Sequence, residues 1–116
     1  MPADPRRGAI WIVDWSPGRG SEQLGMRPAL IVQTDAANTN PRYPNTIVVA
    51  LSTKGHPVAS HVRIDPAPAN GLREPSYAKC EQVMTISKER LRRLLGTLSE
   101  QDMRQVEAGL RQVLVL

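Results

Sequence analysis

Arginine and hydroxyl side chains beside strand-like runs are the groups in this 116-residue sequence that could carry out chemistry. Arg27 comes directly before Pro28 and an apolar run, whereas Ser52 and Thr53 follow the apolar run 46–51. A guanidinium binds two phosphate oxygens at once, and a hydroxyl can donate a hydrogen bond to a phosphate. RNA carries its own nucleophile, the 2′-hydroxyl. Fixed cationic donors could therefore stabilise the transition state of its cleavage without a metal ion.

Glu22 is the acid nearest to Arg27 in the sequence and lies in the glycine-rich segment 18–28. Its carboxylate could accept the 2′-hydroxyl proton or orient Arg27, because arginine itself is almost never deprotonated. Flexible loops between stiff strands often carry binding or catalytic residues. Two simpler interpretations stay open: the segment is a solvated hairpin loop, and Arg27 forms a salt bridge with Asp35 or Glu22.

Histidine and cysteine offer no site that the sequence supports. His56 and His61 lack the HExxH or CxxC context of metal ligands, and Gly18 and Gly20 are not followed by a Walker A ending. Cys80 is the only cysteine, which excludes an intramolecular disulfide and indicates a small core residue in a reducing compartment. We therefore predict no metal ion and no cofactor.

Charge and composition are compatible with a nucleic-acid partner. The net charge is +4, and 12 of the 15 cationic residues are arginine, whose planar fork matches phosphate geometry. A genome rich in arginine codons would give the same bias. With two Trp, two Tyr and no Phe, a platform that stacks several bases is not expected. The sequence has neither a run of about 18 apolar residues nor a signal peptide, so we predict a cytoplasmic protein without a membrane partner.

Apolar runs predict strands in the first two thirds of the chain and helices in the last third. The strands are expected at 9–13, 29–33, 46–51, 61–65 and 77–84. Ser87 could cap a short helix that ends at Gly96 and has as its apolar face Leu91, Leu94 and Leu95. Ser99 could cap the final helix, in which Gly109 could mark close packing. This order predicts one α+β domain, 1–116, with helices packed on a small, strongly bent antiparallel sheet.

Several motifs, in this order along nearly the whole chain, resemble the MazF/PemK/Kid family of toxin endoribonucleases. They are Arg7-Gly8-x-Ile10-Trp11-x-Val13-Asp14, Pro17-x-Arg19-Gly20-Ser21-Glu22-Gln23, Arg27-Pro28-Ala29-Leu30, Thr46 to Ser52, Gly71-Leu72-x-x-x-Ser76, and Glu81-Gln82-Val83-x-Thr85-Ile86-x-Lys88-x-Arg90-Leu91. The resemblance implies an SH3-like, PemK/CcdB-type bent antiparallel barrel of about five to seven strands with a C-terminal helix. It also implies a homodimer.

The resemblance further implies a toxin of a type II toxin–antitoxin system that cleaves single-stranded RNA, leaving a 2′,3′-cyclic phosphate and a 5′-OH. Arg27 stands where the family has its catalytic arginine. Ser52 stands where the family commonly has threonine, so Thr53 would supply the hydroxyl if the register differs by one. With Glu22 these form the predicted catalytic set.

The predicted RNA-binding set is Arg19, Ser21, Gln23, Thr53, Lys54, His61, Ser76 and Gln82. Gln82 could instead be an edge-strand residue that bonds to the backbone. A MazE-like antitoxin is expected to lay an acidic segment across the basic groove. The competing hypothesis is a non-enzymatic toxin that resembles CcdB and poisons a protein such as DNA gyrase.

Overall fold

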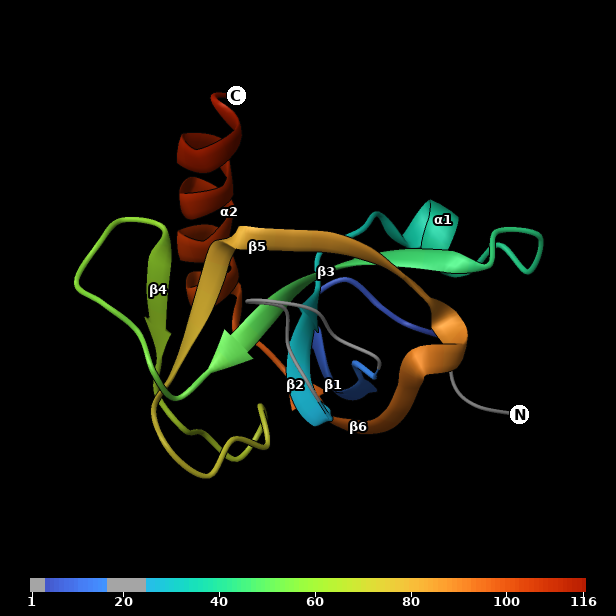
Figure 1. Ribbon diagram of the computed structural model, residues 1–116, viewed down its shortest axis with the longest axis horizontal. Helices are drawn as coiled ribbons and strands as arrows, with labels where there is room; N and C mark the ends of the chain where they lie inside the picture. The colour runs from blue at the N-terminus through green and yellow to red at the C-terminus, as the bar shows by residue number, and fades with distance from the viewer. Residues whose placement is uncertain (1–3, 17–24) are drawn as a thin grey trace.

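One antiparallel sheet and a C-terminal helix make up most of the computed structural model, which describes residues 4–16 and 25–116 (Figure 1). Within these residues the sheet has six strands in the order β4-β5-β3-β2-β1-β6. The elements are β1 (Ala9–Asp14), β2 (Met26–Ile31), α1 (Asp35–Asn38), β3 (Asn45–Ser52), β4 (His61–Ile64), β5 (Ser76–Ser87), the 3₁₀ turn η1 (Lys88–Arg90), β6 (Leu91–Thr97) and α2 (Glu100–Leu114).

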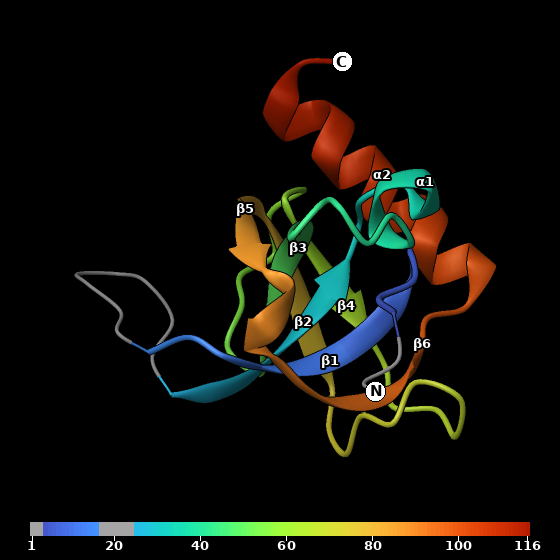
Figure 2. The ribbon, with the colours of Figure 1, turned by 90° about the vertical axis from the view of Figure 1, so that its right-hand side faces the viewer.

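The sheet is strongly bent (Figure 2). Side chains are buried on both of its faces. The long strand β5 pairs with β3 on both sides of a register shift between Val49 and Ala50. The pairing of β1 with β6 shifts register twice. Such irregularities increase the local bend of a sheet. Strands β4 and β6 remain as the two edges, so the barrel-like sheet is not closed. The predicted bent antiparallel fold with a C-terminal helix is confirmed.

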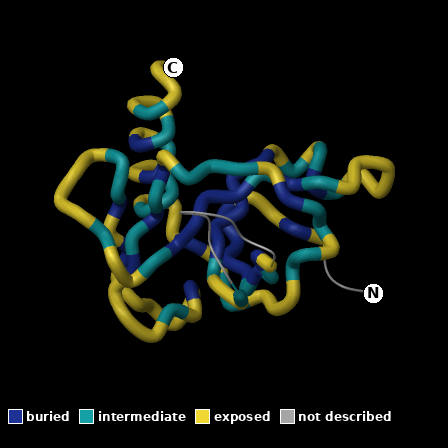
Figure 3. Tube along the Cα trace, viewed as in Figure 1, coloured by how far each residue is buried: buried dark blue, intermediate teal, exposed yellow. Residues whose placement is uncertain are grey.

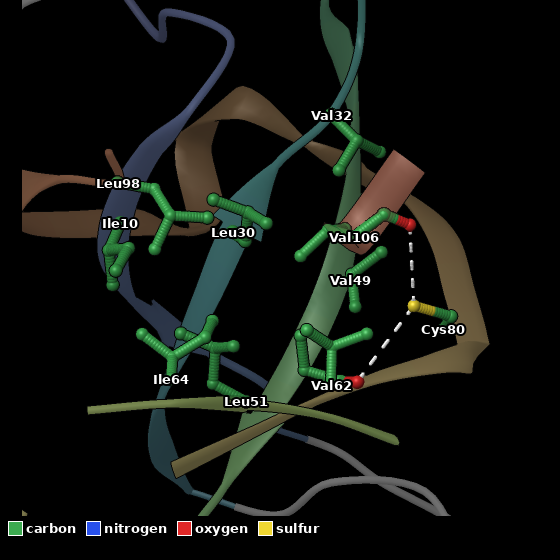
Figure 4. Packing of buried hydrophobic residues seen from close by; sticks show 11 residues of the cluster. Ile10, Leu30, Val32, Val49, Leu51, Val62, Ile64, Cys80, Leu98 and Val106 are labelled. Atoms are coloured by element: carbon green, nitrogen blue, oxygen red, sulfur yellow. Dashed lines mark hydrogen bonds between the residues drawn. The ribbon is translucent and has the colours of Figure 1, made fainter. Parts of the chain in front are cut away.

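The two faces hold separate cores, because alternate residues of each strand point to opposite sides. We call the side covered by α2 the helix face; its buried residues include Ile10, Leu30, Val49, Leu51, Val62, Ala78 and Val106 (Figure 4). We call the other side the tryptophan face; its buried residues include Trp11, Val13, Trp15, Ala29, Ile31, Val48 and Ile86. Figure 3 shows the buried segments concentrated in the centre of the sheet.

The helix predicted over 87–96 is wrong. Ser87 does act as a cap, since its Oγ accepts the N–H of Glu89 at 3.2 Å, but the cap serves only the single 3₁₀ turn η1. The chain then extends as β6, which pairs with β1. This pairing satisfies the backbone groups along β1, and such tertiary contacts override a helix-like spacing of leucines.

Helix α2 begins as predicted and packs closely on β5. Ser99 Oγ accepts the N–H of Asp102 at 3.1 Å. A Cβ placed on Gly109 would lie 2.7 Å from the Sγ of Cys80, so only glycine fits without a shift. The same Sγ donates to the carbonyl of Val106 at 3.7 Å (Figure 4). The residues after this contact, 114–116, are exposed apolar side chains.

We expect Gly109→Ala to destabilise the protein by about 1 kcal/mol. Alanine favours the helix by about 1 kcal/mol, but forcing a methyl group against a buried neighbour typically costs about 1–3 kcal/mol. Cys80→Ala removes the obstructing sulfur, so Gly109→Ala should become harmless or stabilising in that background. A double-mutant cycle measured by urea unfolding tests this coupling. Ala108→Gly, at an exposed neighbouring position, is the control and should add independently to Cys80→Ala; additivity for Gly109→Ala as well would contradict the close contact.

Candidate active site

Arg27 and Ser52 lie at the same end of the sheet on neighbouring strands. Ala29 of β2 pairs with Ala50 of β3 in an antiparallel ladder. Arg27 and Ser52 are each two residues further toward one end, so both present their side chains on the tryptophan face. Arg27 is exposed and Ser52 is partly exposed. The Nε1–H of Trp15 donates to the Arg27 carbonyl at 3.2 Å and so fixes the backbone that carries the guanidinium.

The strands next to β3 add further polar groups to this end of the tryptophan face. Tyr77 of β5 pairs with Ser52, and Arg63 of β4 pairs with Tyr77. Two residues further along β5, Lys79 pairs with His61. Side chains of paired residues lie on the same face of the sheet, so this face, which carries Arg27, also carries Tyr77, Arg63, Lys79 and His61. This part of the sheet presents three cationic residues and a phenol around one hydroxyl, a combination that suits a phosphate backbone.

A bulge in β5 brings two more polar residues to the site. Val49 and Ala50 of β3 pair with Val83 and Lys79, so residues 80–82 lie between their partners without one of their own. Glu81 is exposed and Gln82 is partly exposed. The Gln82 side chain makes no hydrogen bond with another described residue, and β5 lies between β4 and β3 in the sheet. The alternative in which Gln82 is an edge-strand residue that bonds to the backbone is therefore wrong.

His61 joins the bulge to the loop that follows β3. Its Nε2 lies 2.6 Å from Oε2 of Glu81, and its Nδ1 accepts the backbone N–H of His56 at 3.0 Å. Because Nδ1 is an acceptor, Nε2 carries the proton and donates it to the carboxylate. The two imidazole rings also stack, with centroids 5.6 Å apart. The His61 side chain is only 6% exposed, against 41% for Glu81, so the carboxylate is the accessible end of this pair.

The Glu81 carboxyl is held ionised by its surroundings. Burial raises its pKa, but the hydrogen bond from His61 lowers it and the net pKa lies below the ordinary value. Lys79 acts in the same direction through its charge. The site therefore contains a carboxylate that can accept hydrogen bonds from a ligand, whereas the other described carboxylate here, Asp65, is paired with Arg63 at 3.0 Å.

Ser52 and Thr53 point to opposite faces of the sheet. Ser52 Oγ accepts the N–H of Lys54 at 3.1 Å, which leaves the hydroxyl proton available to a ligand. Thr53 instead lines a cleft on the helix face, together with Pro28 and Ser76. Ser76 is buried and its hydroxyl donates to the carbonyl of Glu74 at 3.2 Å. The structure thus brings Ser52, and not Thr53 or Ser76, to the face of Arg27.

Asp35 is occupied elsewhere, at the beginning of α1. Its carboxylate accepts the backbone N–H of Arg7 at 2.7 Å and the side-chain amide of Asn38 at 3.1 Å. The bond from Arg7 is the main reason why the pKa of Asp35 lies below its ordinary value. A salt bridge between Asp35 and Arg27 is therefore excluded.

The predicted site residues Arg19, Ser21, Glu22 and Gln23 lie outside the described part of the chain.

Comparison with known proteins settles the family. The profile of PemK-like, MazF-like toxins of type II toxin–antitoxin systems matches residues 6–114. The chain is also 38% identical, over 108 residues, to the endoribonuclease MazF of Staphylococcus epidermidis, a match that covers 90% of this chain and 87% of that relative. The chain belongs to the MazF/PemK toxin family. The resemblance drawn from its motifs is confirmed.

Solved structures agree with this MazF-type fold. MazF of Deinococcus radiodurans superimposes with a TM-score of 0.82 at 18% identity, covering 99% of this chain and 100% of that one. A mycobacterial endoribonuclease in complex with its cognate antitoxin gives a TM-score of 0.78 at 23% identity, covering 97% and 96%. At these identities the likeness concerns the fold.

The remaining reactive groups of this MazF-family chain lie outside the site. Cys80 is fully buried, and burial raises the pKa of its thiol to about 11, as expected for a core residue and not for a nucleophile. Among the described residues, no three histidine, cysteine or acidic side chains are grouped so as to hold a metal ion. None of the described helices is long and apolar enough to cross a membrane.

The sequence analysis did not predict that Tyr77, Lys79 and Arg63 lie on the face of Arg27. It also did not predict that Glu81 presents an accessible carboxylate there. Alternation in β5 places 77 and 79 on one face, but only the pairing with β3 shows that this is the face of Arg27. His61 was expected to bind RNA directly. Its side chain is only 6% exposed and its Nε2 lies 2.6 Å from the Glu81 carboxylate.

We expect His61→Ala to raise the pKa of Glu81. Burial raises this pKa, and the variant removes the hydrogen bond and charge of His61 that lower it. A depressed carboxyl pKa contributes stability above its ordinary range and loses it as the pH falls through the folded value. The half-exposed pair should contribute less than about 1 kcal/mol. Carboxyl-carbon NMR shifts, followed against pH, measure the change directly. The Asp35 carboxyl, which is held by Arg7, is the internal control and should keep its low pKa; an unchanged Glu81 would contradict the pairing.

Proposed function

We propose that this endoribonuclease toxin of the MazF family cleaves single-stranded RNA, in the first place mRNA, at short sequence motifs and without a metal ion. The observation that carries the proposal is the placement of Arg27 and Ser52 on one face at one end of the sheet. Further cations, Lys79 and Arg63, lie on the same face. These groups supply the charge that a phosphate-centred transition state requires.

The proposed reaction is a transesterification within the RNA. The 2′-oxygen forms a bond to the adjacent phosphorus while the bond from phosphorus to the 5′-oxygen breaks, which gives a 2′,3′-cyclic phosphate and a 5′-OH. The 2′-hydroxyl proton passes to a base, for which Glu22 is our candidate, and the leaving 5′-oxygen takes up a proton. Arg27 binds two non-bridging oxygens as charge develops. Ser52 donates its hydroxyl proton to the same phosphate, since its oxygen already accepts the N–H of Lys54.

RNA outside the scissile phosphate would meet the groups around this pair. We assign backbone contacts to Arg19 and Lys54, and base contacts to Ser21, Gln23, Gln82 and Glu81. Thr53 would contact RNA from the other face. His61 and Ser76, which are engaged with Glu81 and Glu74, would position their neighbours and not bind RNA themselves.

The same toxin would be controlled by a cognate MazE-like antitoxin and act in the cytoplasm. The net charge of +4 suits an acidic inhibitory segment, and a related mycobacterial endoribonuclease is solved with its antitoxin. We further propose a homodimer, because Leu114, Val115 and Leu116 are 48%, 88% and 85% exposed at the end of α2. Sedimentation equilibrium at micromolar concentration that returned only the 12.8 kDa monomer would exclude this dimer.

We expect the purified protein to cleave a long mixed-sequence RNA in EDTA at a recurring motif. Arg27→Ala and Arg27→Lys should each reduce the rate at least about 100-fold, since neither can bind the phosphate with two parallel bonds. Mapping of the 5′-OH ends measures both cleavage and specificity. Arg104→Ala, on the exposed face of α2, should cleave normally. If the folded protein arrests growth but leaves RNA intact, the CcdB-like, protein-directed toxin becomes the better explanation.

The opposite orientations of Ser52 and Thr53 predict different effects of removing each hydroxyl. Ser52→Ala should lower kcat about 100-fold, as for other transition-state donors that are removed, whereas Thr53→Ala should change kcat less than about threefold. Ser52→Thr keeps the hydroxyl and should retain most of the activity. Single-turnover cleavage of a short oligonucleotide distinguishes the two variants. The reverse order of effects would show that Thr53 supplies the catalytic hydroxyl.

A further inference from the structure

A second polar site lies on the helix face of the sheet, directly behind Arg27 and Ser52. It is a cleft of about 320 Å³. Its apolar lining includes Ile12 and Pro28, which pair across β1 and β2, and Leu95 of β6. No part of the proposed catalytic chemistry uses this cleft. Its position at the catalytic end of the sheet suggests a role in binding the same substrate.

Two arginines line the cleft and are available to a ligand. Arg93 lies on β6 and pairs with Ile12 of β1, and Arg73 lies on the loop before β5. Both are exposed, and neither makes a hydrogen bond or ion pair with another described residue. Glu74 lines the same cleft, and its carboxylate is likewise unpaired among the described residues. The cleft therefore combines two available cationic forks, one available carboxylate and an apolar surface.

The loop that carries Arg73 is held in one position by hydrogen bonds to its backbone groups. Asn70 is 3% exposed, and its Oδ1 accepts the N–H groups of Ala67 and Leu72 at 3.1 and 3.0 Å. The carbonyl of Ala69 accepts the N–H of Thr97 at 2.7 Å. These bonds tie the loop both to itself and to the end of β6.

Two glycines permit the close approach of this loop to β6. A Cβ on Gly71 would lie 2.3 Å from the carbonyl oxygen of Leu95, and one on Gly96 would lie 2.3 Å from that of Ala69. The wall of the cleft is thus built before a ligand arrives, which lowers the entropic cost of binding.

The cleft begins one residue after each member of the catalytic pair along the chain. Pro28 follows Arg27, Thr53 follows Ser52, and both following residues line the cleft. A flexible chain whose phosphate sits between Arg27 and Ser52 can therefore bend over the end of the sheet and place a neighbouring nucleotide in the cleft. Single-stranded RNA has this flexibility and presents unstacked bases to proteins.

We propose that this cleft is a subsite for one nucleotide of the RNA next to the cleavage position, an inference that rests on the proposed function. Arg73 and Arg93 bind the phosphate of that nucleotide, and its base lies on the apolar lining. Glu74 accepts a hydrogen bond from an exocyclic amino group, as carboxylates do in base recognition. The subsite therefore favours adenine, cytosine or guanine over uracil, which has no amino group.

The test compares two oligonucleotides. One, the minimal substrate, is a dinucleotide that holds only the scissile phosphate, and the other extends the same dinucleotide by two nucleotides on each side. We expect Arg73→Gln and Arg93→Gln each to raise KM for the extended substrate about tenfold, the usual effect of removing a hydrogen bond to a charged group. KM for the minimal substrate and kcat for both should stay the same. The slope of log affinity against log salt should fall by about 0.7 for each phosphate that the variant no longer neutralises.

Controls separate the subsite from general charge and from the partner protein. Arg104→Gln, with its charge on the exposed face of α2, should leave KM for both substrates unchanged. Glu74→Gln should reduce discrimination against uracil in the extended positions. If the folded double variant cleaves the extended substrate with unchanged KM and salt slope, the subsite is refuted. The same holds if the variants weaken only the binding of the antitoxin, because the cleft would then belong to a protein partner.

Failure of the proposed function gives a different result. In that case the wild-type protein would not cleave the long mixed-sequence RNA, and no motif would be mapped. Fluorescence anisotropy with a non-cleavable 2′-O-methyl oligonucleotide of mixed sequence still measures the contribution of Arg73 and Arg93 to binding. Equal affinities of the wild-type protein and the double variant in that assay would overturn the subsite independently of turnover.

Discussion

The pairing of β3 with its two neighbours is the constraint on which the site depends. Side chains alternate along a strand, so a register shift of one residue would exchange Ser52 for Thr53 on the tryptophan face. The core prevents such a shift. Val48, Val49, Ala50 and Leu51 are at most 1% exposed, alternately on the two faces, and each side packs against a different cluster. A slip would place every one of these side chains in the wrong core. Hydrophobic packing in the centre of the sheet therefore positions the polar groups at its end.

The departures from regular structure lie where the site needs them. A regular ladder would have kept β5 in register with β3, but the bulge at 80–82 adds the exposed carboxylate of Glu81 to the cationic face. Bulges commonly redirect side chains near functional sites. His61 then holds this carboxylate and the loop after β3 together through its two ring nitrogens. One imidazole thus connects two segments that are far apart in the sequence. Both of its ring nitrogens are used in these hydrogen bonds.

The sequence allowed the strands, the final helix and the resemblance to be predicted, but not the arrangement of the site. Local periodicity identifies β1, β3 and β4, because their alternation or apolar runs are clear. It fails at Leu91, Leu94 and Leu95, whose spacing fits a helix until the unpaired edge of β1 is taken into account. Periodicity also cannot assign Lys79 to the face of Arg27, since this depends on register between strands. The cleft on the helix face depends on the close approach of a loop to β6. Gly71 and Gly96 permit this approach, but their presence in the sequence does not predict it.

The site around Arg27 and the cleft on the helix face have different consequences for catalysis in the proposed mechanism. A group that binds substrate and transition state equally lowers KM without raising kcat, whereas one that meets charge only as it develops raises kcat. Arg27 and Ser52 are placed to touch the reacting phosphate and so act on kcat. Arg73 and Arg93, on the other face, can touch only an unreactive neighbour and so act on KM and on the choice of site. Because the sheet separates these groups physically, specificity can change through the loop 71–74 and β6 without disturbing the register that holds the catalytic pair.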